Sequence, residues 1–350
     1  MDKRISNNVK ILSFVVSCFM VLFHTGSYEN ANAFSGFDTR LSDLFNYEYK
    51  LLAYFGLCFF FSVTGFLLFY GLSFDNYLKK IERRIHSLLI PYLAWQAFVL
   101  LKDLCIGRRF DPIDVLLKTF GLQLWPPDGP LWYIYVVFLL AVFLTPVLLL
   151  LFRNKKIAWI STFVLFVLIQ LLRHTTVDSV RMIVDYGLFS RILIYLPAYM
   201  IGAYYGRFYK EIKLPESLIY SVALVLFGFL LNCKIDGFFN DMVMMTLPMV
   251  LIFVLPSIPK LENRKIYEYT FLIYALHYPF IIDFKKFIDA GLSVIPLPVT
   301  VLNLFEHLLI LAVSVLLAVG VSKLLGKICP KCLEIITGGR TKVSDKKAGC

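Results

Sequence analysis

Long apolar segments separated by short polar and basic loops run along nearly the whole chain. Each holds about 20 mostly apolar residues, the length at which an α-helix crosses the hydrocarbon core of a bilayer. The pattern predicts ten spans, near 9–28, 51–72, 86–106, 130–152, 157–173, 188–206, 216–232, 241–258, 266–284 and 301–325. We therefore expect an all-α integral membrane protein with one helical domain, 1–326, and a basic, disordered cytoplasmic tail, 327–350.

The composition supports a polytopic membrane protein. Of the 350 residues, 59% are hydrophobic and 17% are charged, against about 45–50% and about 25% in soluble domains. The first apolar segment lacks a small-residue cleavage site, so we expect a retained anchor. The seven cysteines are not typical of a disulfide framework, and Cys329 and Cys332 form a single CxxC without further zinc ligands nearby. We expect no metal.

Charge orients the predicted bundle. With both termini on one side, about two-thirds of the Lys and Arg residues fall on that side, which the positive-inside rule places in the cytoplasm. The net charge of +11 thus reflects membrane topology and contact with lipid, and we expect no nucleic-acid partner.

His24 is the polar residue that stands out in the first span. It follows Lys10 by 14 residues, or about 21 Å along a helix, which places it in the outer third of a core about 30 Å thick. An imidazole there is costly unless it faces a cavity or a partner, and histidine exchanges protons near neutral pH. The alternative is an interfacial histidine that reaches the outer headgroups.

A basic run opens the third span, with Lys80, Arg83 and Arg84 at positions i, i+3 and i+4 of a predicted helix. Such a run can anchor the helix on anionic lipid. It can also form a phosphate clamp, because guanidinium forks and ammonium groups bind phosphate oxygens. A coenzyme A thioester would suit that surface.

Two other predicted spans carry polar groups at membrane depth. In FFFSVTGFLLFYG, Gly65 favours close helix packing and Ser62 could line a pocket. In YEYTFLIYALHYPF, His277 and Tyr278 precede Pro279, which frees a backbone carbonyl. His277 is therefore a candidate functional group or a structural histidine bonded to that carbonyl.

Six motifs occur in a familiar order: VLFHTG, FFFSVTGFLL, LLIPYLAW, PLWYIYVVFLL, LPAYMIGAYYGR and FLIYALHYPF. From about residue 8 to 325 the chain resembles the acyltransferase-3 family of integral-membrane acyltransferases. It is similar to bacterial members that O-acetylate or otherwise acylate cell-surface polysaccharides, which implies a multi-pass protein of the bacterial inner membrane.

The resemblance implies transfer of an acyl group, most often acetyl, from cytosolic acyl-CoA to a hydroxyl of a glycan or glycolipid. His24 matches the family's first-span histidine, and we expect it to act as the general base. An acyl-histidine intermediate is the alternative. His277 is a further catalytic candidate, and Ser62 and Tyr278 are candidate hydroxyl donors near the reacting carbonyl.

The basic residues would then bind the donor. Arg83 and Arg84 match the family's basic cluster at the third span, and we expect Lys80 to hold donor phosphates with them. Many members carry Arg or Lys eleven residues before the first-span histidine, whereas this chain has Ser13 there. The role of the missing cation could be taken by Lys10 or be lost.

Two other functions stay open at this stage. A transporter or flippase of lipid-linked sugar would also have many spans and intramembrane histidines, but such proteins more often show inverted repeats, and this sequence shows none. A catalytically inactive family member acting as a scaffold would account for Ser13.

Overall fold

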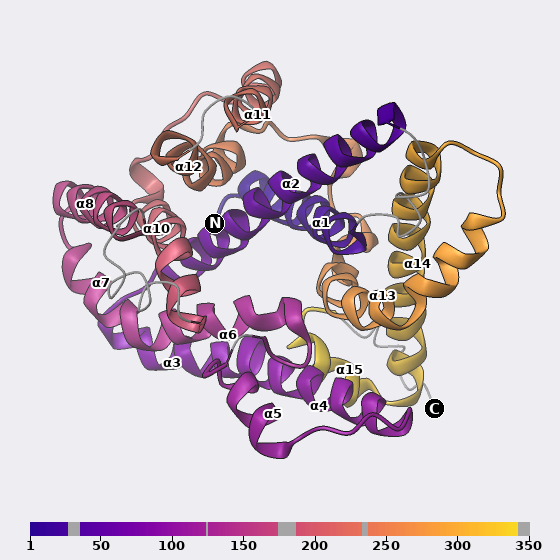
Figure 1. Cartoon of the computed structure of the whole chain (residues 1–350). Coiled ribbons are helices and arrows are strands. Elements are labelled where there is room, and N and C mark those ends of the chain that lie inside the picture. The colour runs from indigo at the N-terminus through magenta and orange to yellow at the C-terminus, as the bar shows by residue number, and fades with distance from the viewer. Residues whose placement is uncertain (27–35, 124, 174–186, 233–236, 342–350) are drawn as a thin grey trace, which may run out of the picture.

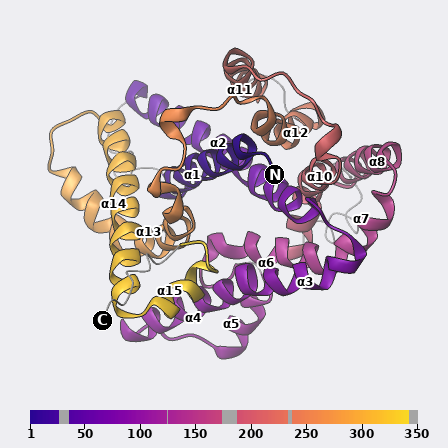
Figure 2. The same cartoon turned by 180° about the vertical axis from the view of Figure 1, so that it is seen from behind.

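The computed structural model is helical throughout the residues that it describes, 1–26, 36–123, 125–173, 187–232 and 237–341 (Figure 1). Two helices, α1 and α2, pack side by side near the middle of the molecule, and the others surround them in both views (Figures 1 and 2). The helices are α1 (Lys3–Thr25), α2 (Gly36–Phe69), α3 (Phe74–Arg84), α4 (Ile90–Cys105), α5 (Pro112–Thr119), α6 (Trp132–Leu139), α7 (Thr145–Leu151), α8 (Lys155–Arg173), α10 (Gly187–Arg207), α11 (Leu218–Asn232), α12 (Phe238–Val254), α13 (Thr270–Ser293), α14 (Val299–Ile328) and α15 (Pro330–Thr337).

Six helical stretches of the described residues are long and apolar enough to cross a membrane: Lys3–Thr25, Leu52–Phe69, Phe74–Cys105, Gly129–Leu151, Lys155–Arg173 and Thr300–Ile328. The other four predicted spans also fall on helices, but α11 and α12 are shorter, and α13 is charged in its second half. The all-helical fold is thus confirmed, whereas the count of ten spans is not. The cytoplasmic location of both termini stays a prediction.

The outer helices expose large apolar side chains. Phe143, Leu171 and Leu316 are 73%, 67% and 68% exposed. Isolated exposed apolar residues are common, but a row of them on each outer helix forms a continuous apolar surface, and contact of such a surface with water is unfavourable. These faces suit contact with lipid hydrocarbon.

Two of the spanning stretches bend at prolines. A π-helical segment, Ile85–Leu89, joins α3 to α4 just before Pro91, and another, Leu140–Leu144, joins α6 to α7 just before Pro146. Proline has no N–H for the carbonyl four residues earlier. At the second bend that carbonyl belongs to Val142, and the hydroxyl of Tyr77 donates to it at 2.5 Å. A side chain of α3 thereby replaces the missing backbone bond.

Glycines let α2 and α10 approach each other closely. A Cβ atom on Gly202 would lie 1.8 Å from the carbonyl oxygen of Ser62, and one on Gly65 would lie 2.2 Å from that of Tyr199. The Ser62 hydroxyl donates to the carbonyl of Ala198 at 2.9 Å. Small residues and hydroxyl bonds across helices are the usual means of packing in a membrane.

The start of α1 is fixed against the end of α12. The Nη1 atom of Arg4 donates to the carbonyls of Phe253 and Leu255, at 2.7 and 2.9 Å, and the buried Asn8 amide donates to Leu255 at 2.7 Å. The last carbonyls of a helix have no partner within it. These bonds satisfy them and set the axial position of α1, and with it the position of His24.

The predicted disorder of 327–350 is wrong for its first part. Residues Pro330–Thr337 form α15, which packs against α4 and α14. Leu333 and Thr337 are buried, and the Trp95 indole nitrogen donates to the carbonyl of Ile336 at 2.9 Å. The basic composition of 327–350 led to a prediction of disorder and not of this short amphipathic helix. Residues 342–350 lie outside the described residues, and the division into domains stays a prediction.

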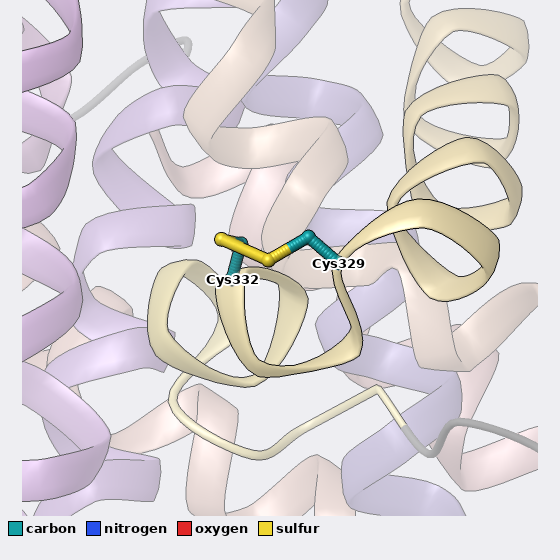
Figure 3. The surroundings of a disulfide bond; sticks show 2 residues. All are labelled: Cys329 and Cys332. Carbon is teal, nitrogen blue, oxygen red and sulfur yellow. A yellow bond between two sulfur atoms is a disulfide. The ribbon is translucent and has the colours of Figure 1, made fainter.

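Cys329 and Cys332 are joined by a disulfide at the start of α15, with their Cα atoms 5.3 Å apart (Figure 3). The sequence pattern alone does not predict this disulfide. Its position at the junction of α14 and α15 ties the first turn of α15 to the residue that precedes it.

An ionic cluster joins three helices inside the bundle. The Asp241 carboxylate on α12 accepts hydrogen bonds from Tyr54 on α2 at 2.8 Å, and from Gln170 and Arg173 on α8 at 2.8 and 2.6 Å. A buried charge requires such partners. The cluster fixes α8 and α12 against α2.

Candidate active site

His24 lies in the last turn of α1, where the helix ends at Gly26 with a positive φ of 72°. Its ring is half-buried, and its Nδ1 atom is 2.8 Å from the carbonyl oxygen of Met20, one turn earlier. A carbonyl can only accept a hydrogen bond, so Nδ1 carries the proton. The basic nitrogen of the neutral ring is then Nε2.

His277 lies opposite, on α13, and is fully buried. Its Nδ1 atom is 2.6 Å from the carbonyl oxygen of Tyr274, so this ring is also protonated at Nδ1. The acceptor is not the carbonyl of Ala275, which Pro279 deprives of its helical N–H. His277 is thus held by its own helix, with Nε2 pointing toward α1.

The two histidines form a pair. Nε2 of His277 lies 3.1 Å from Nδ1 of His24, and the ring centroids are 5.0 Å apart. With the tautomers set by Met20 and Tyr274, the Nδ1 proton of His24 is shared between the Met20 carbonyl and the Nε2 lone pair of His277. His277 can therefore stabilise a positive charge on His24 while Nε2 of His24 stays available to a substrate.

Tyr278 completes an aromatic wall beside the pair. Its ring centroid is 5.4 Å from that of His24, in an edge-on arrangement, and Phe23 covers another side at 4.8 Å. Tyr278 also contacts Gly129, because a Cβ atom there would lie 3.1 Å from the tyrosine ring. The structure thus brings together three of the predicted catalytic residues, His24, His277 and Tyr278.

Asp128, next to that contact, was not singled out from the sequence. It is fully buried, and its backbone N–H donates to Oε1 of the buried Gln96 at 2.8 Å. Neither oxygen of its carboxyl group has a hydrogen-bond partner, and neither has the Gln96 amide nitrogen. Burial raises the pKa of Asp128 well above its usual range, an effect that Lys102 opposes. The clue in the sequence was a carboxylate in a rigid turn, WPPDGP, at a membrane surface.

A cavity of about 250 Å³ lies on the other side of Tyr274 from the histidine pair, between α1, α2, α13 and the segment after α15. Phe60, Tyr133 and Tyr274 close its inner end, with centroids 5.2 to 5.8 Å apart. The remaining lining is polar in several places: Ser13, Ser17, Thr64, Arg84, Glu268 and Arg340.

Tyr274 connects the cavity to the pair. Its ring lines the cavity, its carbonyl accepts from His277, and its hydroxyl donates to the carbonyl of Pro130 at 2.5 Å. His277 follows Tyr274 by three residues, which is about 4.5 Å along the helix. The cavity therefore ends one turn short of His277 on α13 and, at Ser17 on α1, about two turns short of His24.

The structure separates the predicted basic cluster. Only Arg84 lines the cavity. Lys80 points elsewhere and donates to the carbonyls of Leu68 and Tyr70, at 2.8 and 2.6 Å, where α2 ends. Arg83 and Lys10 are exposed.

The predicted hydroxyl donor Ser62 does not join the histidine pair. It is fully buried between α2 and α10, and its hydroxyl is bound to the Ala198 carbonyl. In the described part of the chain, no three His, Cys, Asp or Glu side chains gather as a metal site would require.

A family model described as an acyltransferase domain matches residues 11–323, nearly the whole chain. The chain belongs to the acyltransferase-3 family. No curated protein and no solved structure matches it. The family identifies the chain as a membrane acyltransferase in general, which confirms the resemblance based on the six motifs.

In this acyltransferase-3 chain the matched range contains both histidines, Asp128 and Arg84, and it ends before α15. The C-terminal segment that carries Arg340 into the cavity is therefore outside the matched range. The acyl group, its donor and its acceptor stay predictions.

Proposed function

We propose that this protein transfers an acyl group, most often acetyl, from acyl-CoA to a hydroxyl of a cell-surface or lipid-linked glycan at the His24–His277 pair. The observation that supports it is the pair itself: a half-buried imidazole whose Nδ1 proton is held by Met20 and by a second, fully buried imidazole. A general base needs a free lone pair and a partner that stabilises its protonated form.

The proposed reaction has two proton transfers. Nε2 of His24 takes the proton of the glycan hydroxyl as its oxygen attacks the thioester carbonyl. The carbon–sulfur bond then breaks, and the imidazolium returns the proton to the departing thiolate. The products are the O-acyl glycan and the free thiol of coenzyme A. Nε2 of His277 accepts a hydrogen bond from Nδ1–H of His24 while His24 carries the charge.

The cavity supports a donor that enters from the side where α1 begins. Its lining residues from Tyr267 to Tyr274 span the end of the 3₁₀ segment Lys265–Tyr269 and the start of α13, about 10 Å along the chain, and Arg84 also lines it. Guanidinium groups bind phosphate bidentately. The pantetheine arm would extend inward, past Tyr133 and Tyr274. Those two rings and Phe60 close the inner end, so Tyr133 and Tyr274 must move aside when the thioester reaches His24.

The glycan would reach His24 from the opposite side. His24 follows the first cavity residue on α1, Val9, by 15 residues, or about 22 Å. In the predicted orientation this is the outer half of the membrane, where surface glycans are met. Separate entry of donor and acceptor is what transfer across a membrane demands.

The test uses membranes that contain the protein at matched levels. We expect acetyl-CoA-dependent acylation of glycan by the wild type and its loss in His24→Ala, while His86→Ala, an exposed histidine, keeps the activity. Undiminished acylation in His24→Ala would contradict the assignment of the base. Movement of unmodified lipid-linked sugar without acylation would favour a transporter instead.

A further inference from the structure

Arg340 is the last charged residue that the structure describes, and it reaches the same cavity as Arg84. The two arginines come from segments about 250 residues apart, and only Arg84 lies within the family-matched range of 11–323. The sequence alone predicts that Arg340 lies in a disordered tail. Its presence in the cavity therefore requires an explanation of its own.

The segment around Arg340 is held on both sides. Before it, Ile336 accepts a hydrogen bond from the Trp95 indole at 2.9 Å. After it, the Thr341 hydroxyl donates to the carbonyl of Glu268 at 3.0 Å, at the rim of the cavity. The segment is thus fastened to α4 and to the 3₁₀ segment Lys265–Tyr269 that precedes α13.

The turn before Arg340 is closely fitted. Gly338 has a φ of +59°, and a Cβ atom on it would lie 2.8 Å from the backbone of Ser87, in the π-helical segment that follows Arg84. This left-handed turn reverses the chain after α15. It directs Arg340 back toward the helix that carries Arg84.

The cavity lining carries two arginines, Arg84 and Arg340, against one carboxylate, Glu268, so positive charge is in excess. Arg340 donates to the Thr337 carbonyl at 2.9 Å and lies over the Phe271 ring at 4.5 Å, and neither Arg340 nor Arg84 has an ion pair among the described residues. Although Arg340 is an exposed residue, desolvation of its guanidinium at the cavity and the charge of Arg84 both lower its pKa. Both groups still stay charged at neutral pH, so a bound anion would remove an unfavourable repulsion.

We infer that the C-terminal segment supplies Arg340 as the second guanidinium of a phosphate-binding site, facing Arg84 across the cavity that Ser13 also lines. The ligand class is a phosphate or diphosphate ester, and under the proposed function it is the phosphate part of acyl-CoA. Ser13 leaves the α1 side of this cavity without a charge, and Arg340 brings a positive charge to it from the C-terminal segment. The inference rests on the proposed function only for the identity of the phosphate.

The experiment measures binding to the full-length protein in zwitterionic nanodiscs. We expect Arg340→Gln to weaken acetyl-CoA binding about tenfold or more, as for loss of a charged hydrogen-bonding partner, and Arg340→Lys to weaken it less. Acetyl-pantetheine, which lacks the nucleotide phosphates, should bind equally to all. Lys331→Gln, an exposed residue of α15, is the matched control and should match the wild type. Wild-type acetyl-CoA affinity in Arg340→Gln would overturn the inference.

A second arm separates this inference from the proposed function. If the wild type does not bind acetyl-CoA, the donor assignment fails, and pyrophosphate becomes the probe. Pyrophosphate should then raise the unfolding midpoint of the wild type, and this shift should be reduced most in Arg340→Gln and less in Arg340→Lys. No shift in the wild type would overturn the inference. Nanodiscs with phosphatidylglycerol test whether the phosphate belongs to a lipid. If the wild type retains anionic lipid and Arg340→Gln does not, while both bind the nucleotide equally, the phosphate is that of a lipid headgroup. That result would overturn the donor assignment.

Discussion

Nδ1 of His24 lies 3.1 Å from Nε2 of His277, a residue 253 positions later in the chain. The two rings are not equivalent, because His277 is fully buried and His24 is half-buried. Each Nδ1 faces a backbone carbonyl, which leaves one free lone pair on the accessible ring. Under the proposed function, this asymmetry favours His24 for proton transfer and His277 for a positioning role.

Replacing His277 with Phe should lower kcat by about a hundredfold and leave KM for acyl-CoA nearly unchanged, because the lost acceptor stabilises only the charged form of His24. His277→Gln, which keeps a hydrogen-bonding side chain, should lose less. The measurement is steady-state acylation at several donor concentrations, with unfolding midpoints to confirm folded protein.

The pH profile distinguishes positioning from simple packing. Activity of the wild type should fall at acidic pH as His24 becomes protonated and can no longer accept the hydroxyl proton. His277→Gln should move the midpoint of this fall, because the partner of Nδ1 changes. The exposed His86→Gln should leave both rate and midpoint unchanged. An unmoved midpoint with an intact rate would remove His277 from the site.

Asp128→Asn should stabilise the protein, and increasingly so as the pH rises. The pKa of Asp128 in the folded state is well above that of the unfolded chain, near 3.9, because burial disfavours the charged carboxylate. The folded state therefore binds more protons, and the free energy of unfolding falls by about 1.4 kcal/mol per pH unit from about pH 4 up to the folded pKa. Asparagine does not titrate, so that loss disappears.

The measurement is the unfolding midpoint of wild type and Asp128→Asn between pH 4 and pH 9. The two curves should meet near pH 4 and separate above it. Glu334→Gln, at an exposed position of α15, should track the wild type at every pH. If the midpoints of Asp128→Asn and the wild type instead differ by the same amount at every pH, folding does not change the pKa of the carboxyl group.

The sequence predicted the helices and singled out His24, His277 and Tyr278, which the structure brings together, because both depend on local composition. Runs of apolar residues mark the helices, and a histidine at membrane depth stands out wherever it lies. The sequence could not show that His24 and His277 meet, since no local sequence pattern indicates a contact between residues 253 positions apart. It also could not identify Asp128, whose importance comes from burial without a partner.

The basic residues were harder to predict, because periodicity gives the face of a helix but not what covers it. Lys80 and Arg84 share a face, yet one caps α2 and the other lines the cavity. Arg340 was assigned to disorder because the tail is polar overall. Its short helix is stabilised by burial of Leu333 and Thr337 in the bundle, which composition does not reveal.

Lys80→Met should destabilise the protein without weakening acyl-CoA binding. Its ammonium group satisfies two carbonyls at the end of α2, and hydrogen bonds to charged groups contribute about 1.5–3 kcal/mol. The unfolding midpoint should fall, whereas Lys79→Met, at an exposed neighbouring position, should have little effect. If Lys80→Met instead raises KM for acyl-CoA and keeps the unfolding midpoint of the wild type, Lys80 belongs to the donor site.

Gly202→Ala should be among the most damaging small substitutions in the bundle. The added Cβ atom would lie 1.8 Å from the Ser62 carbonyl oxygen, so α10 must move away from α2, and overpacking of this kind costs about 1–3 kcal/mol or more. Gly320→Ala on α14 is the matched control, because nothing lies within 4 Å of its added Cβ atom and alanine favours the helix by about 1 kcal/mol. Unfolding midpoints in detergent should therefore move in opposite directions, and a Gly202→Ala protein as stable as the wild type would mean that α2 and α10 do not pack this closely.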